Sequence, residues 1–214
     1  MTLTAQIVPS AGCSLELLDI ICHTTSAVFD RSDPRHLSPE HHSTLQSIDH
    51  RLQTLHQEYR IQPTIATTSP PDDETANAAT LHALRLAELY RIAARLYLAR
   101  IARGDVRDNP TVVSLVSEAI DLLRAMGRCE RSWPLFIIAL EARTDDQRRV
   151  VLDAFTGLDK RPLWNMSVTK KLVLAAWVKQ DLGNDDEGAA ERDQLELYYS
   201  VVSGVGRMHP PCFT

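Results

Sequence analysis

Ten residues, SWPLFIIALE from Ser132 to Glu141, carry almost no polar side chain between the first and the last of them. Pro134 suits the first turn of a helix, because a backbone N–H at that point has no intrahelical partner to lose. The residues after it, from Leu135 to Leu140, are apolar and would cover such a helix almost all round. We therefore expect this helix to be buried, with other elements packed around it.

Polar residues directly after this run predict the start of another helix. Thr144 is followed three residues later by Gln147, which matches a capping box. Asp145 and Asp146 would lie in the first turn, where negative charge complements the helix dipole. These acidic residues therefore need no chemical role to explain them.

Glu141 differs, because it stands at the end of an apolar helix. A carboxylate there should be paired or hydrogen-bonded, and Arg143, Arg148 or Arg149 is near enough in sequence to supply the partner. No second acid or base stands beside it, as a catalytic acid would require. We interpret Glu141 as half of a structural ion pair.

Helix starts, stops and periods recur along the chain, and no segment is typical of a strand. Together with the apolar run, the predicted helices number about eight and occupy 15–29, 39–59, 74–103, 110–126, 134–141, 145–155, 168–180 and 190–202. They differ in length and share no repeated signature, which disfavours a regular solenoid. The sequence predicts an all-α fold, a single irregular multi-helix domain over residues 1–214, with a flexible proline- and threonine-rich loop near 61–76.

Charge and cysteine content exclude several classes of protein. The formal net charge of -5 argues against direct nucleic-acid binding, which would need a basic surface with clustered Lys and Arg. The arginines at 85, 91, 95, 100 and 103 are expected to form a solvated helix face. The four cysteines include no CxxC pair, and Cys22 is expected to be a core thiol. No run approaches the roughly 18 apolar residues of a membrane span, so we expect an intracellular protein without membrane contact.

Candidate metal and nucleotide sites fail on spacing. Histidines cluster within 21 residues, but no two are four apart on one helix face as a zinc pair would be. They are His36, His41, His42, His50 and His56. The loop DLGNDDEG, from Asp181 to Gly188, lacks the acidic alternation of a calcium loop. No P-loop, GxGxxG or GxSxG motif is present, so we expect no catalytic, cofactor-binding or metal-binding residue.

Several motifs in order resemble the C-terminal part of the fungal-specific transcription factor domain, the helical regulatory domain of fungal binuclear zinc cluster regulators. They are SWPLFIIALEARTDDQRRVVLDAF, LWNMSVTKKLVLAAWVKQDL and LELYYSVVSGVGRMHPPCFT, with AGCSLELLDIICHTTSAV and LRLAELYRIAARLYLAR upstream. The resemblance extends over about 12–213. Its structural markers are Trp133, Pro134, Glu141, Arg148, Trp177 and Asp181.

The resemblance implies a nuclear module that regulates RNA polymerase II transcription through protein contacts, self-association or a small apolar ligand, and that is not an enzyme. The family's six-cysteine zinc cluster has no counterpart here and would lie in an absent N-terminal segment, so no cofactor is expected in this chain. The domain's opening helices also have no counterpart, so the chain resembles a C-terminal portion. Two alternatives stay open: a partner-binding protein without DNA contact, or an enzyme with a closed polar cavity around Glu141, Trp133 and Trp177.

Overall fold

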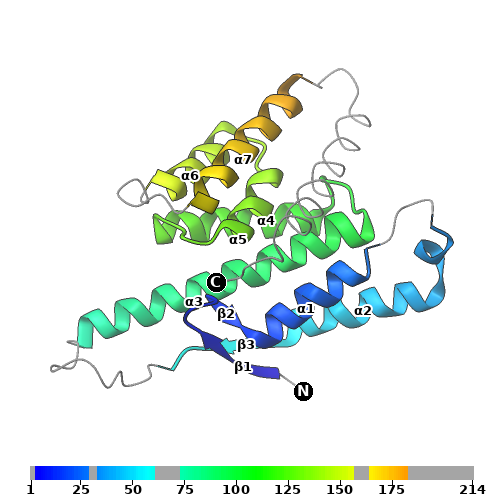
Figure 1. Cartoon of the computed structure of the whole chain (residues 1–214), viewed down its shortest axis with the longest axis horizontal. Helices are drawn as coiled ribbons and strands as arrows, with labels where there is room; N and C mark the ends of the chain where they lie inside the picture. The colour runs from blue at the N-terminus through cyan, green and yellow to red at the C-terminus, as the bar shows by residue number, and fades with distance from the viewer. Residues whose placement is uncertain (1–2, 29–32, 61–72, 157–163, 183–214) are drawn as a thin grey trace. The chain divides into compact units, whose positions relative to one another are not determined.

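The computed structural model describes residues 3–28, 33–60, 73–156 and 164–182 (Figure 1). The chain forms two compact units, Met1–Arg95 and Leu96–Thr214. A single regulatory-type domain over 1–214 stays a prediction. The expected helix at 190–202 lies outside the described residues, as does the loop near 61–76 up to residue 72. Residues 73–76 already belong to a helix.

The prediction of about eight helices and no sheet is wrong. The described residues hold seven α-helices and a three-stranded sheet with strand order β2-β1-β3. The strands are β1 (Leu3–Val8), β2 (Cys13–Ser14) and β3 (Leu55–Glu58). β2 and β3 are too short for alternation of polar and apolar residues to give a clear signal, whereas β1, LTAQIV, does alternate from Leu3 to Ile7, a signal that the all-α prediction overlooked.

Pairing between distant parts of the first unit builds this sheet. β1 turns back onto β2 in antiparallel register, and Gly12, at a φ of 80°, adopts the left-handed conformation that the turn needs. β3 joins the other edge of β1 in parallel register, from Leu3 opposite Leu55 to Gln6 opposite Glu58. The helix predicted to continue to Tyr59 therefore ends at Thr54, because the next residues pair with β1.

Three α-helices complete the first unit: α1 (Leu15–Ser26), α2 (Pro39–Thr54) and most of α3 (Asp73–Tyr97), with a 3-10 helix, η1 (Pro34–Leu37), before α2. The predicted caps are confirmed. The Ser14 hydroxyl accepts the N–H of Leu17 at 3.2 Å, and the Ser38 hydroxyl accepts that of His41 at 3.1 Å. α1 and α2 pack against each other (Figure 1). Their buried side chains include Leu17, Ile20, Leu45, Ile48 and Leu52.

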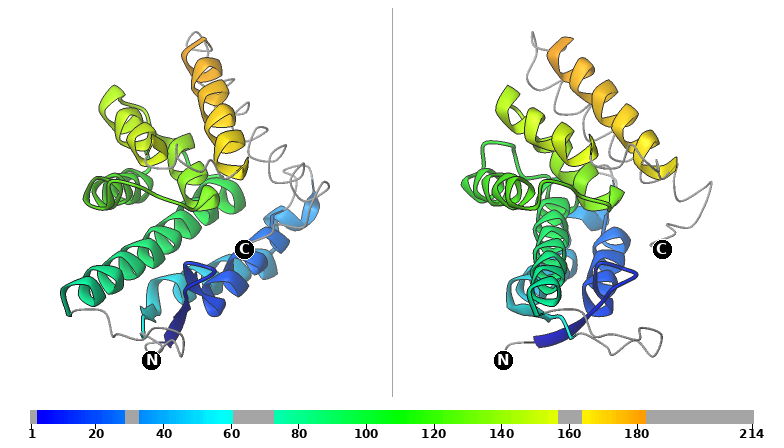
Figure 2. Two further views of the ribbon diagram at one scale, coloured as in Figure 1. Left: turned by 60° about the vertical axis from the view of Figure 1, so that its left-hand side comes forward. Right: turned by 90° about the vertical axis from the view of Figure 1, so that its left-hand side faces the viewer.

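The second unit surrounds one buried helix, as the apolar run requires. α3 passes into a π-helical segment, η2 (Leu98–Arg103), which ends at Gly104 with a φ of 71°. The following helices are α4 (Pro110–Met126), α5 (Ser132–Glu141), α6 (Asp145–Thr156) and α7 (Trp164–Leu182). α4, α6 and α7 all contact α5 (Figure 2), which is buried from Pro134 to Glu141. The buried position predicted for α5 is confirmed.

Local signals between these helices behave as predicted. The Asn109 side chain accepts the N–H of Thr111 at 2.9 Å, and Gly127 ends α4 at a φ of 70°. The capping box is reciprocal, because the Thr144 hydroxyl accepts the N–H of Gln147 and the Gln147 amide oxygen accepts that of Thr144, both at 3.2 Å.

No helix among the described residues is both long and apolar enough to cross a membrane. Cys22 is exposed, so its predicted place in the core is wrong.

Candidate functional site

Side chains from several elements of the second unit meet at the last turn of α5, and we call this group the α5-end cluster. Glu141 comes from α5 itself, and the other members come from η2, the segment before α4, α6 and α7. The cluster consists of Arg100, Arg107, Glu141, Arg148, Trp177, Gln180 and Asp181. Four of the six markers predicted from the sequence belong to it.

Glu141 forms a buried ion pair at the centre of the cluster. Its Oε1 lies 3.0 Å from Nε of Arg100, and its Oε2 lies 3.5 Å from Nε of Arg107. The side chains of Glu141 and Arg100 are only 1% and 0% exposed. Charges so far from water need close partners, since the cost of desolvating each ion is several kcal/mol. The expected partners Arg143, Arg148 and Arg149 are therefore not the ones that hold Glu141 at the centre.

Arg100 reaches Glu141 because it lies in the π-helical segment. The wider i to i+5 turn changes the direction of side chains relative to an α-helix, and Arg100 points inward, where one of its guanidinium N–H groups also donates to the carbonyl of Asp105. The prediction that Arg100 belongs to a solvated face is wrong for this reason. The helical wheel behind that prediction assumes an α-helical turn throughout.

The cluster also supplies hydrogen-bond donors to the carbonyl groups at the end of α5, where a helix offers no i+4 partner. The indole N–H of Trp177 donates to the carbonyl of Ala139 at 2.8 Å. The carbonyl of Leu140 accepts from Nη2 of Arg107 at 2.6 Å and from Nε2 of Gln180 at 3.3 Å. Two guanidinium groups near the negative end of the helix dipole offset the unfavourable position of Glu141.

Arg148 of α6 joins the cluster to α7 through a second ion pair. Its Nη1 and Nη2 donate to the two carboxylate oxygens of Asp181 at 2.9 and 2.8 Å, a bidentate arrangement. Its guanidinium carbon lies 5.2 Å from the ring centroid of Trp177, within the range of a cation–π contact. The hydrogen bonds from Arg148 lower the pKa of Asp181 below its usual 3.8.

Replacing Asp181 by asparagine is expected to lower the free energy of unfolding by less than about 1 kcal/mol at pH 7, because the carboxylate is largely exposed and solvent screens the pair. The native pKa is lowered, so the contribution of the pair is complete above 3.8 and is lost as the pH falls through the native value. Urea unfolding at pH 7 and pH 3 measures the difference in free energy of unfolding between wild type and Asp181→Asn. A difference between Asp181→Asn and wild type that grew at pH 3 would contradict the prediction.

The two remaining markers lie at the start of α5, away from the α5-end cluster. Pro134 occupies the first turn, and the ring of Trp133 packs edge-on against that of Tyr97, with a centroid distance of 6.1 Å. Arg143, which we considered for Glu141, instead donates to the carboxylate of Asp108. The markers thus stabilise both ends of the same buried helix.

Nothing in the α5-end cluster is arranged for chemistry on a substrate. Both oxygens of Glu141 face guanidinium groups, and its side chain is nearly without solvent contact. A general acid or base must be able to reach the proton that it transfers. Among the described residues, no group of three or more His, Cys, Asp and Glu side chains is placed to hold a metal ion. The geometry is that of a structural cluster that holds helices together.

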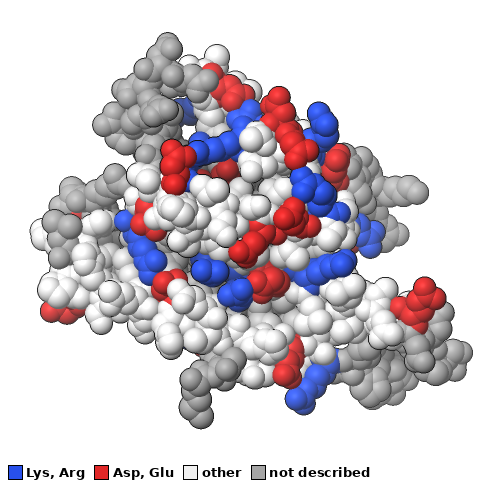
Figure 3. All heavy atoms as spheres, turned by 180° about the vertical axis from the view of Figure 1, so that it is seen from behind, with Lys and Arg blue, Asp and Glu red and all other residues white. Residues whose placement is uncertain are grey.

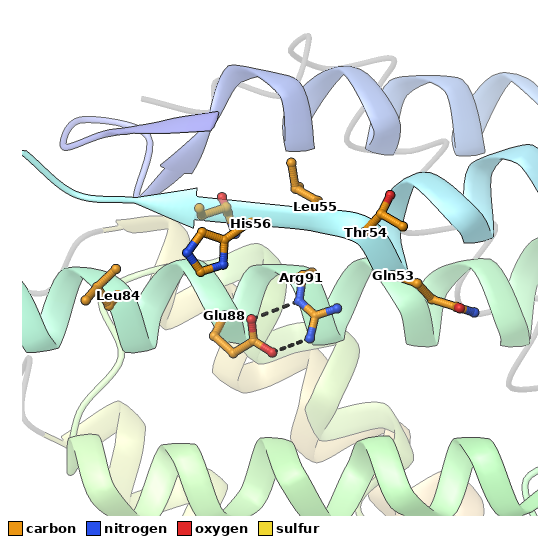
Figure 4. Close-up of a pocket in the computed structure, with 8 residues that line it drawn as sticks. Gln53, Thr54, Leu55, His56, Leu84, Glu88 and Arg91 are labelled. Atoms are coloured by element: carbon orange, nitrogen blue, oxygen red, sulfur yellow. Dashed lines mark hydrogen bonds and ion pairs between the residues drawn. The ribbon is translucent and has the colours of Figure 1, made fainter. Parts of the chain in front are cut away.

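A hollow of about 580 Å³ lies in the first unit, where β3 faces α3 (Figure 4). Its charged side chains already have structural partners. Arg91 pairs with Glu88 at 2.5 Å and also donates to the carbonyl of Leu52 at 3.0 Å, near the end of α2. The remaining lining residues are Gln53, Thr54, Leu55, His56, Gln57 and Leu84.

A larger hollow, of about 820 Å³, lies between α1, η1 and α2. Ala27 and Ile48 give it an apolar part, and His41 is among the polar residues that line it. Arg51, at its edge, donates to Glu16 of α1 at 2.5 Å and to Asp19 at 2.8 Å, so this guanidinium ties α2 to α1. The hollow is large enough for a small organic ligand.

His41 predicts a pH dependence for the first unit. Burial lowers the pKa of His41, and the neighbouring His36 and His42 lower it further. As the pH falls through about 6.5, the unfolded chain takes up a proton at this position before the folded chain does, so stability decreases and then levels off below the native pKa. Urea unfolding followed by circular dichroism measures the free energy of unfolding above and below about pH 6.5. Its decrease on acidification should be smaller for His41→Gln than for wild type. The exposed His50 on the same helix gives the control, and an equal effect of His50→Gln would contradict the prediction.

These features define a helical scaffold whose most buried charges hold helices together. The family model described as the fungal specific transcription factor domain matches residues 2–202, so the chain belongs to this family. The chain is also similar to the transcription factor iacI of Pestalotiopsis fici, with 30% identity over 116 residues. That match covers 54% of this chain and 30% of the relative's length. No solved structure matches the chain significantly. The resemblance noted in the sequence is confirmed, and the family supports a role in transcriptional regulation.

Proposed function

We propose that this chain is a regulatory module in RNA polymerase II transcription that works in the nucleus and is not an enzyme. The family match over 2–202 carries the proposal. The α5-end cluster supports it, since Glu141, the buried acid at its centre, is held by two guanidinium groups. In this proposal the helical scaffold acts by presenting surfaces to other molecules.

Protein contacts, including self-association, are the first way in which such a module acts. On the face seen in Figure 3, acidic and basic side chains alternate over the described residues. A phosphate backbone calls for clustered Lys and Arg, whereas mixed charges suit protein partners. The mixed surface supports protein contacts rather than direct contact with nucleic acid.

Sensing of a small ligand is the second way in which such a module could regulate transcription in this proposal. The hollow of about 820 Å³ between α1, η1 and α2 supports it, because apolar and polar side chains line the same space. Ala27 and Ile48 would contact an apolar ligand, and Ser43 and Ser47 also line the hollow. This lining supports the small apolar ligand that the family resemblance implies.

Tethering tests the regulatory role. The chain is fused to a heterologous DNA-binding domain and assayed on an RNA polymerase II reporter in fungal cells, with a fluorescent tag to follow its location. We expect nuclear accumulation and a change in reporter expression relative to the DNA-binding domain alone. Unchanged expression at equal protein level would overturn the proposal.

A partner-binding protein without DNA contact is a second candidate, because the mixed charges on the face in Figure 3 suit protein partners. Mapping of full-length transcripts at the locus distinguishes the two candidates. An in-frame upstream segment that encodes a six-cysteine cluster supports a regulator that binds DNA itself. A transcript whose start codon is Met1 supports the partner-binding protein.

A further inference from the structure

The lining of the larger hollow, between α1, η1 and α2, suggests at first a site for anions. Two arginines and two histidines contribute to it, against a single carboxylate, that of Glu40. The basic residues are His23, Arg35, His41 and Arg51. The groups that contact the two arginines reverse this assignment, because both guanidinium groups are already bound to carboxylates of the same unit.

Three carboxylates neutralise the two guanidinium groups. Nε of Arg35 lies 3.0 Å from Oδ1 of Asp33, and Nη2 lies 2.6 Å from Oδ2. These hydrogen bonds lower the pKa of Asp33 to about 2, so its carboxylate stays charged at neutral pH. Arg51 contacts two carboxylates of α1, Glu16 at 2.5 Å and Asp19 at 2.8 Å. The positive charge in the lining is therefore fully compensated.

Glu40 is the charged group of the lining that is left over. It is exposed in the first turn of α2 and forms no ion pair within the described part of the chain. Residues 14–28 and 33–54 together hold five carboxylates and two guanidinium groups, a formal charge of -3 with the histidines neutral. Burial lowers the pKa of His41, which keeps this imidazole neutral at pH 7. The surroundings of the hollow are therefore negative.

The apolar part of the hollow lies about two helical turns from Glu40. Ile48 comes eight positions later on α2, a rise of about 12 Å. Ile48 and Ala27 are buried, at 3% and 6% exposure, and both line the hollow. A ligand that spans this distance would bring an apolar body to one end of the hollow and a polar group to the other.

We propose that the hollow binds amphipathic amines, with the ammonium group beside Glu40 and the apolar body against Ala27 and Ile48. This inference rests on the proposed sensing of a small ligand and names the chemical class of that ligand. Opposite charges attract the ammonium group to Glu40. A carboxylate ligand would meet a like charge there, and it would find both guanidinium groups of the lining already paired.

Three probes with the same alkyl chain test the proposal: decylammonium, decanoate and decanol. Isothermal titration calorimetry measures the Kd of each for the full chain, at low ionic strength and below the critical micelle concentration. We expect decylammonium to bind about tenfold more tightly than decanoate, with decanol between them. Equal affinities, or a preference for decanoate, would overturn the proposal while leaving ligand binding by the hollow intact. If no probe binds, the proposed ligand sensing fails together with the inference.

A charge variant tests the role of Glu40. Glu40→Gln should weaken the binding of decylammonium about threefold, because an exposed ion pair is a weak interaction, and should leave decanol unchanged. The matched control, Glu118→Gln, removes an exposed carboxylate from α4 in the second unit and should change neither affinity. An equal loss in both variants, or no loss in Glu40→Gln, would contradict the assignment of the ammonium group to Glu40.

A blocking variant tests where the alkyl chain binds. Ser47 lines the hollow and is exposed, so Ser47→Phe adds volume there without disturbing the core. It should weaken both decylammonium and decanol by at least about tenfold. Circular dichroism checks that the variant is folded. Undiminished binding of both probes by folded Ser47→Phe would place the site elsewhere and overturn the proposal.

Discussion

Replacing Glu141 by glutamine is expected to lower the free energy of unfolding of the second unit by about 3–5 kcal/mol. The variant leaves the fully buried guanidinium of Arg100 without its carboxylate, 41 residues away along the chain. It also weakens the contact with Arg107. Urea unfolding followed by tryptophan fluorescence measures the loss, because all three tryptophans, Trp133, Trp164 and Trp177, belong to this unit.

Two matched variants separate the loss of the ion pair from a general effect of charge removal. Glu130→Gln removes an exposed carboxylate, 3.6 Å from Arg128, and should cost less than about 1 kcal/mol. Arg100→Met combined with Glu141→Leu removes both charges and should recover much of the stability lost in Glu141→Gln. If Glu141→Gln cost no more than Glu130→Gln, the ion pair would not stabilise the fold as we infer.

Replacing Trp177 by alanine is expected to cost about 3–5 kcal/mol, the range for large-to-small changes of buried aromatic residues. The indole is 5% exposed, donates to the carbonyl of Ala139 and lies beneath the guanidinium of Arg148. The change therefore leaves a cavity and removes one of the two donors to the carbonyl of Ala139, which also accepts the N–H of Ala142. Circular dichroism in urea measures the loss without relying on tryptophan emission.

The neighbouring residue offers the control. Val178→Ala changes a side chain that is 58% exposed and should cost no more than about 0.5 kcal/mol within the helix. Trp177→Phe keeps much of the ring but loses the N–H donor, and should cost about 1–3 kcal/mol. If Trp177→Ala were as stable as Val178→Ala yet abolished the reporter response, Trp177 would be a functional residue and not a core residue.

Helix ends were predictable where a few neighbouring residues determine them. Ser14, Ser38 and Asn109 cap helices through hydrogen bonds within three residues, and Gly104 and Gly127 end helices through their left-handed backbone. Such interactions depend only on local sequence. The pairing of the strands was not predictable, because β3 is extended only where β1, far away in the sequence, supplies its hydrogen-bond partners.

In the candidate site, too, the sequence indicated some residues, whereas only the structure showed their contacts. The sequence pointed to Glu141, Arg148, Trp177 and Asp181, but as markers of a family and not as neighbours in space. The structure shows that all four lie at the α5-end cluster. It also adds Arg100, which the sequence pattern had placed on a solvated face, and Arg107, which no pattern marked, because their contact with Glu141 depends on the π-helical segment and on the segment that follows it.

For this protein, the sequence by itself determined that α5 is buried and where most helices begin and end, because apolar coverage and capping are properties of consecutive residues. Only the tertiary structure decided the partners of Glu141 and the existence of the sheet. Those depend on contacts between residues far apart in the chain, whose geometry is set by the packing of whole elements and not by the spacing of neighbours.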